Sequence, residues 1–253
     1  TVDDFYVAAE RVRRENIAPV GDMSCHDDAV TVNNIGDVVQ RLRETKLLVV
    51  GRNGMSNDSL NQKTAEVFGT QVIRIDFPTL DEAYKKADPD EAAEWADRWI
   101  EQAAKVIEPT REEIIKSGAM YLAMRKLMKE HGARAVAVHC LGGFYGGHLT
   151  AYPCLGFAQL NNDGLVGACE ADVMSTITML ALGYLVERPG FISDPVLDTA
   201  KNQIIYAHCV APSKVFGPEG STNPHHIRSH SEDRKGAAIR SLMPLGYMTT
   251  SLK

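Results

Sequence analysis

Residues Lys46-Leu47-Leu48-Val49-Val50 form a continuous apolar run of strand length, and this run decides the fold. Two further runs of the same kind follow at residues 71–76 and 133–141. Helical patterns surround them, at residues 35–43 and over a long tract at residues 80–131. Continuous apolar runs that alternate with helices are typical of a parallel sheet buried on both faces. The sequence therefore predicts an α/β fold with a Rossmann-like parallel sheet domain.

The long helical tract contains one clear break. Pro109 cannot continue a helix, and Thr110 directly after it is a good N-cap. We therefore predict two helices in this tract, the second of which begins after Thr110.

The pattern changes after about residue 155. A turn signal at residues 161–164 precedes an apolar helix predicted over residues 168–186. Two strand-like runs follow at residues 191–196 and 203–208, and the residues between them fit a hairpin turn. This part of the chain is therefore predicted to be rich in antiparallel strands.

Two domains are predicted from this change of pattern. An α/β domain covers residues 1–155, and an antiparallel β-rich C-terminal domain covers residues 156–253. The chain begins at Thr1 without an initiator Met and stops inside residues 246–252, which resemble an interrupted strand. We therefore expect the C-terminal domain to be truncated and the chain to be part of a longer protein.

Composition and charge narrow the class of partner. The net charge is −6, and the basic residues are scattered except for Arg11, Arg13 and Arg14, a cluster typical of a solvated helix face. Nucleic-acid binding depends on phosphates neutralised by Lys and Arg, so a small molecule or a protein is the expected partner. No apolar run approaches the length of a membrane span, and the N-terminus does not resemble a signal peptide.

The cysteines point to a reducing compartment. The chain has five, an odd number, with no C-x-x-C pair. A disulfide framework or a zinc ribbon is therefore not expected. We predict a cytoplasmic protein.

Glycine-rich segments follow two of the predicted strands. Residues 51–54 lack the third glycine of a dinucleotide-binding loop and the Lys-Ser/Thr pair of a P-loop, so a tight turn is predicted there and no nucleotide cofactor is expected. Residues 142–147 follow a parallel strand at the end where α/β folds bind ligands. They fit either a binding loop or an ordinary mobile loop.

The sequence also lacks the common hydrolase motifs G-x-S-x-G and H-E-x-x-H. Cys140 stands next to His139, but neighbours on a strand point to opposite faces, so these two side chains are not expected to form a catalytic pair. Cys140 is predicted to be a buried structural residue.

Glu170, Asp194 and His208 form a more promising combination. Each has an ordinary explanation: Glu170 as a carboxylate near a helix N-terminus, Asp194 as a paired charge in a strand, and His208 as a hydrogen-bonded core residue. Together, two carboxylates and an imidazole on neighbouring elements fit an oxygen-rich site for Mn²⁺ or Mg²⁺ better than a thiolate site for zinc.

Several segments resemble a known family. The clearest is Ala-Cys-Glu-Ala-Asp at residues 168–172, followed by Asp194, 24 residues after Glu170. The other segments are residues 153–156, 176–180 and 207–212. In these segments the chain resembles the L-fucose/L-arabinose isomerase superfamily, above all its L-fucose isomerase-like members. The family is longer, so the resemblance implies that the chain holds the middle and C-terminal portions.

The resemblance implies roles for individual residues. Glu170 and Asp194 match ligands of a catalytic Mn²⁺ that also serve as acid and base, and His208 matches a metal-ligating histidine of the arabinose branch. Another divalent cation, such as Mg²⁺ or Co²⁺, would fit the same site. Fucose isomerases take their ligating histidine from nearer the C-terminus. Further candidates for a ligand or for substrate binding are therefore His225, His226, His230 and Arg228, for which a solvated polar loop is the ordinary alternative.

The chemistry of such a site is consistent with these residues. Removing the proton α to a sugar carbonyl gives an enediolate, whose developing charge a divalent cation stabilises. A nearby carboxylate can take this proton and return it to the neighbouring carbon. We predict Glu170 as the principal base and Asp194 as a ligand that assists, although the two roles could be exchanged.

The predicted function is a metal-dependent aldose–ketose sugar isomerase of carbohydrate metabolism. The resemblance implies a homo-oligomer, a trimer or hexamer, whose active sites take residues from a neighbouring subunit. The alternative is a non-catalytic sugar-binding or regulatory protein that retains the isomerase fold.

Overall fold

The computed structural model describes residues 26, 28–51 and 58–252. Contacts divide the chain into two units, a main unit at residues 30–243 and 251–253 and a small unit at residues 1–29 and 244–250. Within the small unit, the backbone N–H of His26 donates to the carbonyl oxygen of Gly246 over 2.7 Å. Described residues 244–252 contain no strand, so the interrupted strand predicted at residues 246–252 is wrong.

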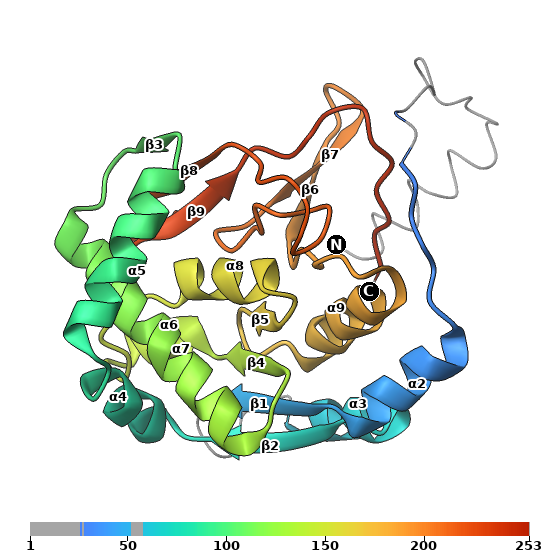
Figure 1. Ribbon diagram of the computed structural model, residues 1–253, viewed down its shortest axis with the longest axis horizontal. Coiled ribbons are helices and arrows are strands. Elements are labelled where there is room, and N and C mark those ends of the chain that lie inside the picture. Colours follow the sequence, from blue (N-terminus) through green and yellow to red (C-terminus); the bar gives the residue numbers. More distant parts are fainter. Residues whose placement is uncertain (1–25, 27, 52–57, 253) are drawn as a thin grey trace. The chain divides into compact units, whose positions relative to one another are not determined.

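A parallel sheet forms the centre of the main unit (Figure 1). Its strand order is β2-β1-β4-β5, with β1 at Lys46–Val50 and β4 at Ala135–Val138 in the middle and β2 at Gln71–Ile75 and β5 at Val166–Ala168 at the edges. All three pairings are parallel. The three apolar runs predicted as strands are confirmed, and β5 is a fourth strand that was not predicted.

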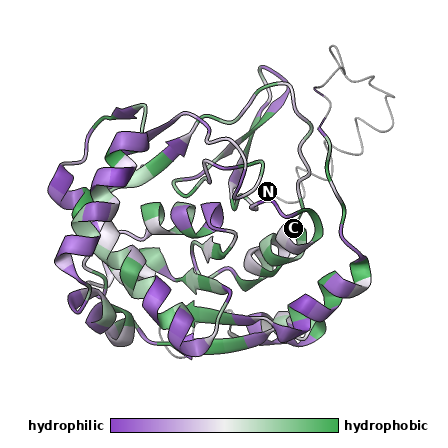
Figure 2. Cartoon of the chain, in the orientation of Figure 1, coloured by the Kyte–Doolittle hydropathy of each residue, from purple (hydrophilic) through white to green (hydrophobic). Residues whose placement is uncertain are grey.

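Both faces of this sheet are buried. Leu48, Val50 and Val136 pack into one apolar core, and Leu47 and Val49 pack into another on the opposite face. This division follows from the alternation of side chains along a strand. In Figure 2 the strands of this sheet are largely green, whereas the surrounding helices carry many purple residues.

Helices cover the two faces. The first layer contains α4 (Phe77–Lys85), α5 (Pro89–Gln102), α6 (Arg111–His131) and α8 (Cys154–Asn162). The second contains α2 (Ile35–Glu44), α3 (Asp58–Phe68) and α9 (Val173–Val186).

Helix boundaries follow local capping chemistry. Thr110 caps α6 as predicted, because its hydroxyl oxygen accepts the backbone N–H of Glu113 over 3.4 Å. The first half of the predicted tract, however, is two helices and not one. Asp88 caps α5 with Pro89 at its first position, and the short strand β3 (Lys105–Val106) precedes α6.

The C-terminal part adds strands outside the central sheet. β6 (Asp194–Asp198) and β7 (Gln203–Ala207) form the predicted antiparallel hairpin. β8 (His225–Arg228) pairs antiparallel with β9 (Ala238–Ser241) and parallel with β3. The α/β class with additional antiparallel strands is confirmed. The domain boundary near residue 155 stays a prediction, and β5 after it belongs to the parallel sheet.

Two glycine-rich segments have different outcomes. Residues 142–147 were predicted as a loop, but most of them lie in the short helix α7 (Cys140–Tyr145). Of the predicted tight turn at residues 51–54, all but Gly51 falls outside the described residues, as do Cys25 and the arginine cluster at residues 11–14.

Candidate metal centre

Glu170 lies just beyond the carboxyl end of β5. The predicted helix start at residue 168 is wrong, because α9 begins at Val173 and Asp172 is its cap, accepting the backbone N–H of Ser175 over 2.9 Å. Glu170 therefore does not cap a helix. It occupies the left-handed region with φ 62°, as does Ala171 with φ 51°.

This turn is unusual because neither residue is glycine. A left-handed conformation costs a non-glycine residue on the order of 1 kcal/mol, and such residues often lie at functional sites. The backbone N–H of Ala171 donates to the carbonyl oxygen of Val138 over 3.0 Å, which fixes the turn to the end of the neighbouring strand β4. The backbone that carries Glu170 is thus anchored at this edge of the sheet.

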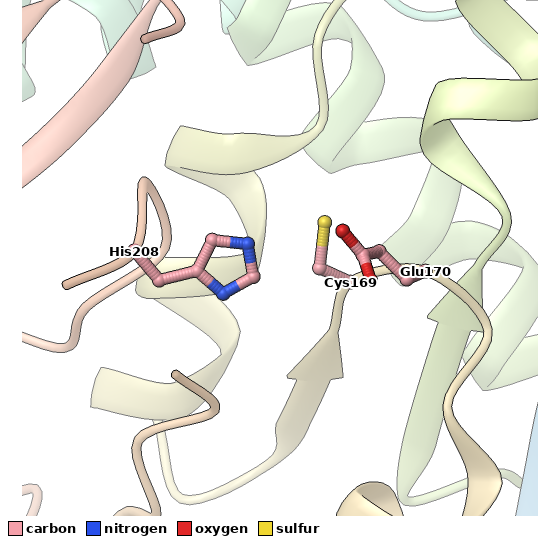
Figure 3. A group of neighbouring side chains, drawn as sticks. All are labelled: Cys169, Glu170 and His208. Carbon is pink, nitrogen blue, oxygen red and sulfur yellow. The ribbon is translucent and has the colours of Figure 1, made fainter. Parts of the chain in front are cut away.

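Three potential donor atoms meet at this edge. The Cys169 Sγ, a Glu170 carboxylate oxygen and a His208 ring nitrogen all lie within 4.8 Å of one another. Figure 3 shows the His208 ring directed toward Cys169 and Glu170 from a separate segment of the chain. Among the described residues, this is the one group of three or more His, Cys, Asp or Glu side chains that could hold a metal ion. The structure thus brings two of the three predicted ligands together.

His208 follows β7 and is oriented by a backbone carbonyl. Its Nδ1 lies 3.1 Å from the carbonyl oxygen of Ile192. A proton on Nδ1 in this hydrogen bond leaves the Nε2 lone pair for a cation, an arrangement common in metal centres. Burial opposes the charged ring, but hydrogen bonding to Cys209 raises the pKa of His208 to about 9. A cation bound at Nε2 would therefore replace a proton.

Asp194, the third predicted ligand, lies close to this group but outside it. It is the first residue of β6 and is exposed, so its charge does not need a partner in the way that a buried charge in a strand would. Partial burial of Glu170, followed by the negative charge of Asp194, raises the pKa of the Glu170 carboxyl group. Asp194 is thus near enough to act on Glu170 electrostatically.

Three of the additional candidates have other surroundings. The His225 Nδ1 lies 3.1 Å from the carbonyl oxygen of Asn223 in a buried position. The His226 Nδ1 is buried and has no hydrogen-bond partner within the described part of the chain. Arg228 forms an ion pair with Glu108. None of the three belongs to the Cys169, Glu170 and His208 group.

His230 comes nearer to that group. It is buried, and its Nδ1 lies 3.1 Å from the Asp233 Oδ1. Hydrogen bonding to Cys209 and to Asp233 raises the pKa of His230 to about 9. Cys209 also raises the pKa of His208, so this cysteine lies near both imidazoles. Of the four additional candidates, His230 is the one for which the structure gives such a link.

A group of buried thiols surrounds the site, and the sequence did not predict it. The Sγ atoms of Cys140 and Cys169 are 2.9 Å apart, and those of Cys154 and Cys209 are 3.6 Å apart. All four cysteines are free and buried. Cys140 is thus buried as predicted. β4 ends at Val138, so the strand alternation assumed for His139 and Cys140 does not apply.

The proximity of two of these thiols could have been predicted from the sequence if the strand β5 had been recognised. Cys140 and Cys169 each follow a strand of the parallel sheet, β4 and β5, which are neighbours. The carboxyl ends of neighbouring parallel strands meet at one edge. The missing information was the strand β5 itself.

Comparison with known proteins gives relatives of one kind. The chain is 29% identical over 182 residues to a sulfoquinovose isomerase of Clostridium sp. (strain MSTE9), covering 69% of this chain and 40% of that protein. It is also 29% identical over 186 residues to the sulfoquinovose isomerase of Priestia megaterium, covering 70% and 41%. The chain thus spans about 40% of the length of these relatives. No family model matches it.

The structure and these similarities agree on a coarse description. The chain is similar to sugar isomerases and has an α/β fold with a parallel sheet. In the part of the chain that the structure describes, no helix has both the length and the apolar character that crossing a bilayer requires.

Proposed function

We propose that the protein is a metal-dependent aldose–ketose sugar isomerase of carbohydrate metabolism. The observation that carries this proposal is the meeting of the Glu170 carboxylate and the His208 imidazole within 4.8 Å at the carboxyl edge of a parallel sheet. Ligands in α/β folds bind at this edge. The similarity to sulfoquinovose isomerases supports the same reaction class.

The donor atoms fit a divalent cation such as Mn²⁺. Glu170 supplies carboxylate oxygens and His208 supplies an imidazole nitrogen that a backbone carbonyl orients. Asp194 lies on the adjacent hairpin and would complete the ligand set. When bound, the cation would polarise the sugar carbonyl and stabilise negative charge on its oxygen.

Glu170 is the proposed base. Isomerisation requires that a proton leave the carbon α to the carbonyl and return to the neighbouring carbon. A carboxylate within reach of these carbons can carry the proton from one to the other, and Glu170 supplies the carboxylate in this group of donor atoms. The turn at Glu170 and Ala171 is anchored to β4, which would help to position the carboxylate for both transfers.

We further propose that the substrate is a small sugar and that the active protein is a homo-oligomer, a trimer or hexamer. Sulfoquinovose, the sugar in the names of the relatives, is the first substrate to test.

The test uses the full-length protein loaded with Mn²⁺. It is incubated with sulfoquinovose, L-fucose and L-arabinose, and ketose formation is followed by carbon-13 NMR. Conversion of at least one sugar is expected, together with its loss in Glu170→Gln and its retention in Glu82→Gln. Glu82 is an exposed carboxylate on α4, where it pairs with Lys86. Glu82→Gln therefore makes the same chemical change as Glu170→Gln at a position away from the site. If the native protein converts none of a wide set of aldoses, a sugar-binding role replaces the proposal.

A further inference from the structure

The proposed isomerase mechanism gives no role to Cys169, although its Sγ lies in the same group of donor atoms as Glu170 and His208. The cysteine is buried. A carboxylate oxygen and an imidazole nitrogen alone suit several divalent cations, but a thiolate sulfur selects soft or borderline ones, such as zinc. Cys169 therefore bears directly on which cation the centre holds.

The backbone explains why consecutive residues reach the same point. In an extended strand, Cys169 and Glu170 would point to opposite faces of the sheet. The left-handed conformation of Glu170, with φ 62°, ends this alternation immediately after β5. The thiol then lies beside the carboxylate, and the His208 ring points toward both (Figure 3). The strained left-handed turn thus places a sulfur donor and an oxygen donor side by side.

We propose that Cys169 is a ligand of the same centre, so that sulfur, oxygen and nitrogen from Cys169, Glu170 and His208 together bind a divalent cation. This donor set favours a thiophilic cation, such as Co²⁺ or Zn²⁺, over the Mn²⁺ that an oxygen-rich site would take. This inference rests on the metal centre in the proposed function and adds a ligand to it. On binding, the Cys169 S–H bond breaks, a sulfur–metal bond forms, and the proton passes to solvent.

The first test is spectroscopic and does not depend on activity. Co²⁺ is titrated into the metal-stripped full-length protein under a phosphine reductant, and the near-ultraviolet thiolate-to-cobalt charge-transfer absorption is recorded. Native protein is expected to show this band with one bound Co²⁺. Cys169→Ser is expected to lose the band and still bind Co²⁺ through Glu170 and His208. Cys154→Ser, a buried cysteine outside the group of three, should keep it.

The outcomes separate this inference from the proposed function. Bound Co²⁺ without a charge-transfer band in native protein overturns the sulfur ligand and leaves the isomerase metal centre standing. Absence of Co²⁺ binding overturns both. A band that persists in Cys169→Ser also overturns the inference, because another thiol must then be the ligand.

A second measurement covers the case in which Cys169→Ser does not fold. X-ray absorption of the native protein loaded with Zn²⁺ is expected to show a sulfur neighbour at about 2.3 Å beside nitrogen and oxygen neighbours at about 2.0–2.2 Å. A spectrum that contains only the nitrogen and oxygen shell would contradict the inference.

Discussion

Two regions of the main unit differ in how their polar side chains are accommodated. In the helical layer, Trp95, Trp99 and Tyr121 form an aromatic cluster with ring centroids 4.7–5.9 Å apart. The Trp99 indole donates to Gln159 over 2.9 Å, and the Tyr121 hydroxyl donates to Asp163 over 2.9 Å. Each large apolar ring is packed, and these two polar groups have partners.

The edge of the sheet at Glu170 is arranged differently. It contains two consecutive non-glycine residues in the left-handed region, a carboxyl group with a raised pKa and two thiols with Sγ atoms 2.9 Å apart. The left-handed turn and the raised pKa cost the folded state free energy, whereas the packed rings and hydrogen bonds of the aromatic cluster favour it. The difference indicates that the edge is arranged for chemistry and the helical layer for stability. Mutations in the two regions should therefore separate activity from stability.

The largest expected effect is on activity at the sheet edge. Glu170→Gln should lower the isomerisation rate by about 10³-fold, within the range of general-base contributions. The free energy of unfolding of the metal-free chain should change by less than about 0.5 kcal/mol, because the Glu170 side chain keeps substantial exposure to solvent although its carboxyl group is desolvated in part. Steady-state kinetics and urea denaturation measure the two quantities. A variant that turns over at the native rate would remove Glu170 from the mechanism.

The largest expected effect on stability lies in the helical layer. A methyl group added at Gly118 in α6 would overlap the backbone carbonyl oxygen of Ala92 in α5, which cannot move as a side-chain end can. Gly118→Ala should therefore lower the free energy of unfolding by about 2–3 kcal/mol, as overpacking does. Urea denaturation measures the loss.

Gly132→Ala is a matched control for that change. Gly132 follows the end of α6 with φ 64° and nothing lies near its added methyl group, so its cost is conformational only, about 1 kcal/mol. If Gly118→Ala and Gly132→Ala lowered the free energy of unfolding equally, the added methyl group would not be overpacked between α5 and α6, and the prediction would be wrong.

A smaller effect is expected at the start of α6. Thr110→Ala removes the oxygen that accepts the Glu113 N–H and should cost about 1 kcal/mol of unfolding free energy. Thr110→Ser keeps this oxygen and should restore most of the loss. Thermal denaturation of the three proteins provides the comparison, and identical midpoints would mean that the cap is not used.

The smallest effect is a pH dependence near the site. Burial opposes the charge on Asp233, but hydrogen bonds from Tyr152, Lys235 and His230 lower the pKa of its carboxyl group. A carboxyl group with a lowered pKa in the folded state stabilises the fold above its unfolded pKa, and this stabilisation is lost as pH falls through the folded pKa.

Asp233→Asn should therefore be less stable than the native protein at neutral pH, and the two should converge in acid. Denaturation at a series of pH values measures the gap. A gap that stays constant from neutral pH down to the acid limit would contradict this origin.

The sequence predicts three of the four strands in the parallel sheet because each is a continuous apolar run. β5 escapes prediction because Val166–Ala168 is short and contains Gly167. A methyl group at Gly167 would lie 2.7 Å from the Cα of Phe157, so glycine is there to admit α8 and does not mark a turn.

The candidate site is predicted in part for similar reasons. Glu170 and His208 are identified from motifs, and the structure brings them together. Cys169 is missed because its position depends on a left-handed backbone at Glu170, which no residue type announces. The exposure of Asp194 is not predicted, because apolar residues of its hairpin are themselves exposed, with Val196 at 57% and Ile204 at 45%, and its role as a ligand stays a prediction. An apolar strand pattern does not reveal whether another element covers it.

The most direct test of the account is calorimetric titration of Mn²⁺ into the metal-stripped full-length protein, with Glu170→Gln and His208→Gln beside it. One site is predicted in the native protein, with affinity at least about tenfold lower in each variant. Native affinity in Glu170→Gln or in His208→Gln, or no binding in the native protein, would contradict the claim that these two side chains form the metal centre of an isomerase.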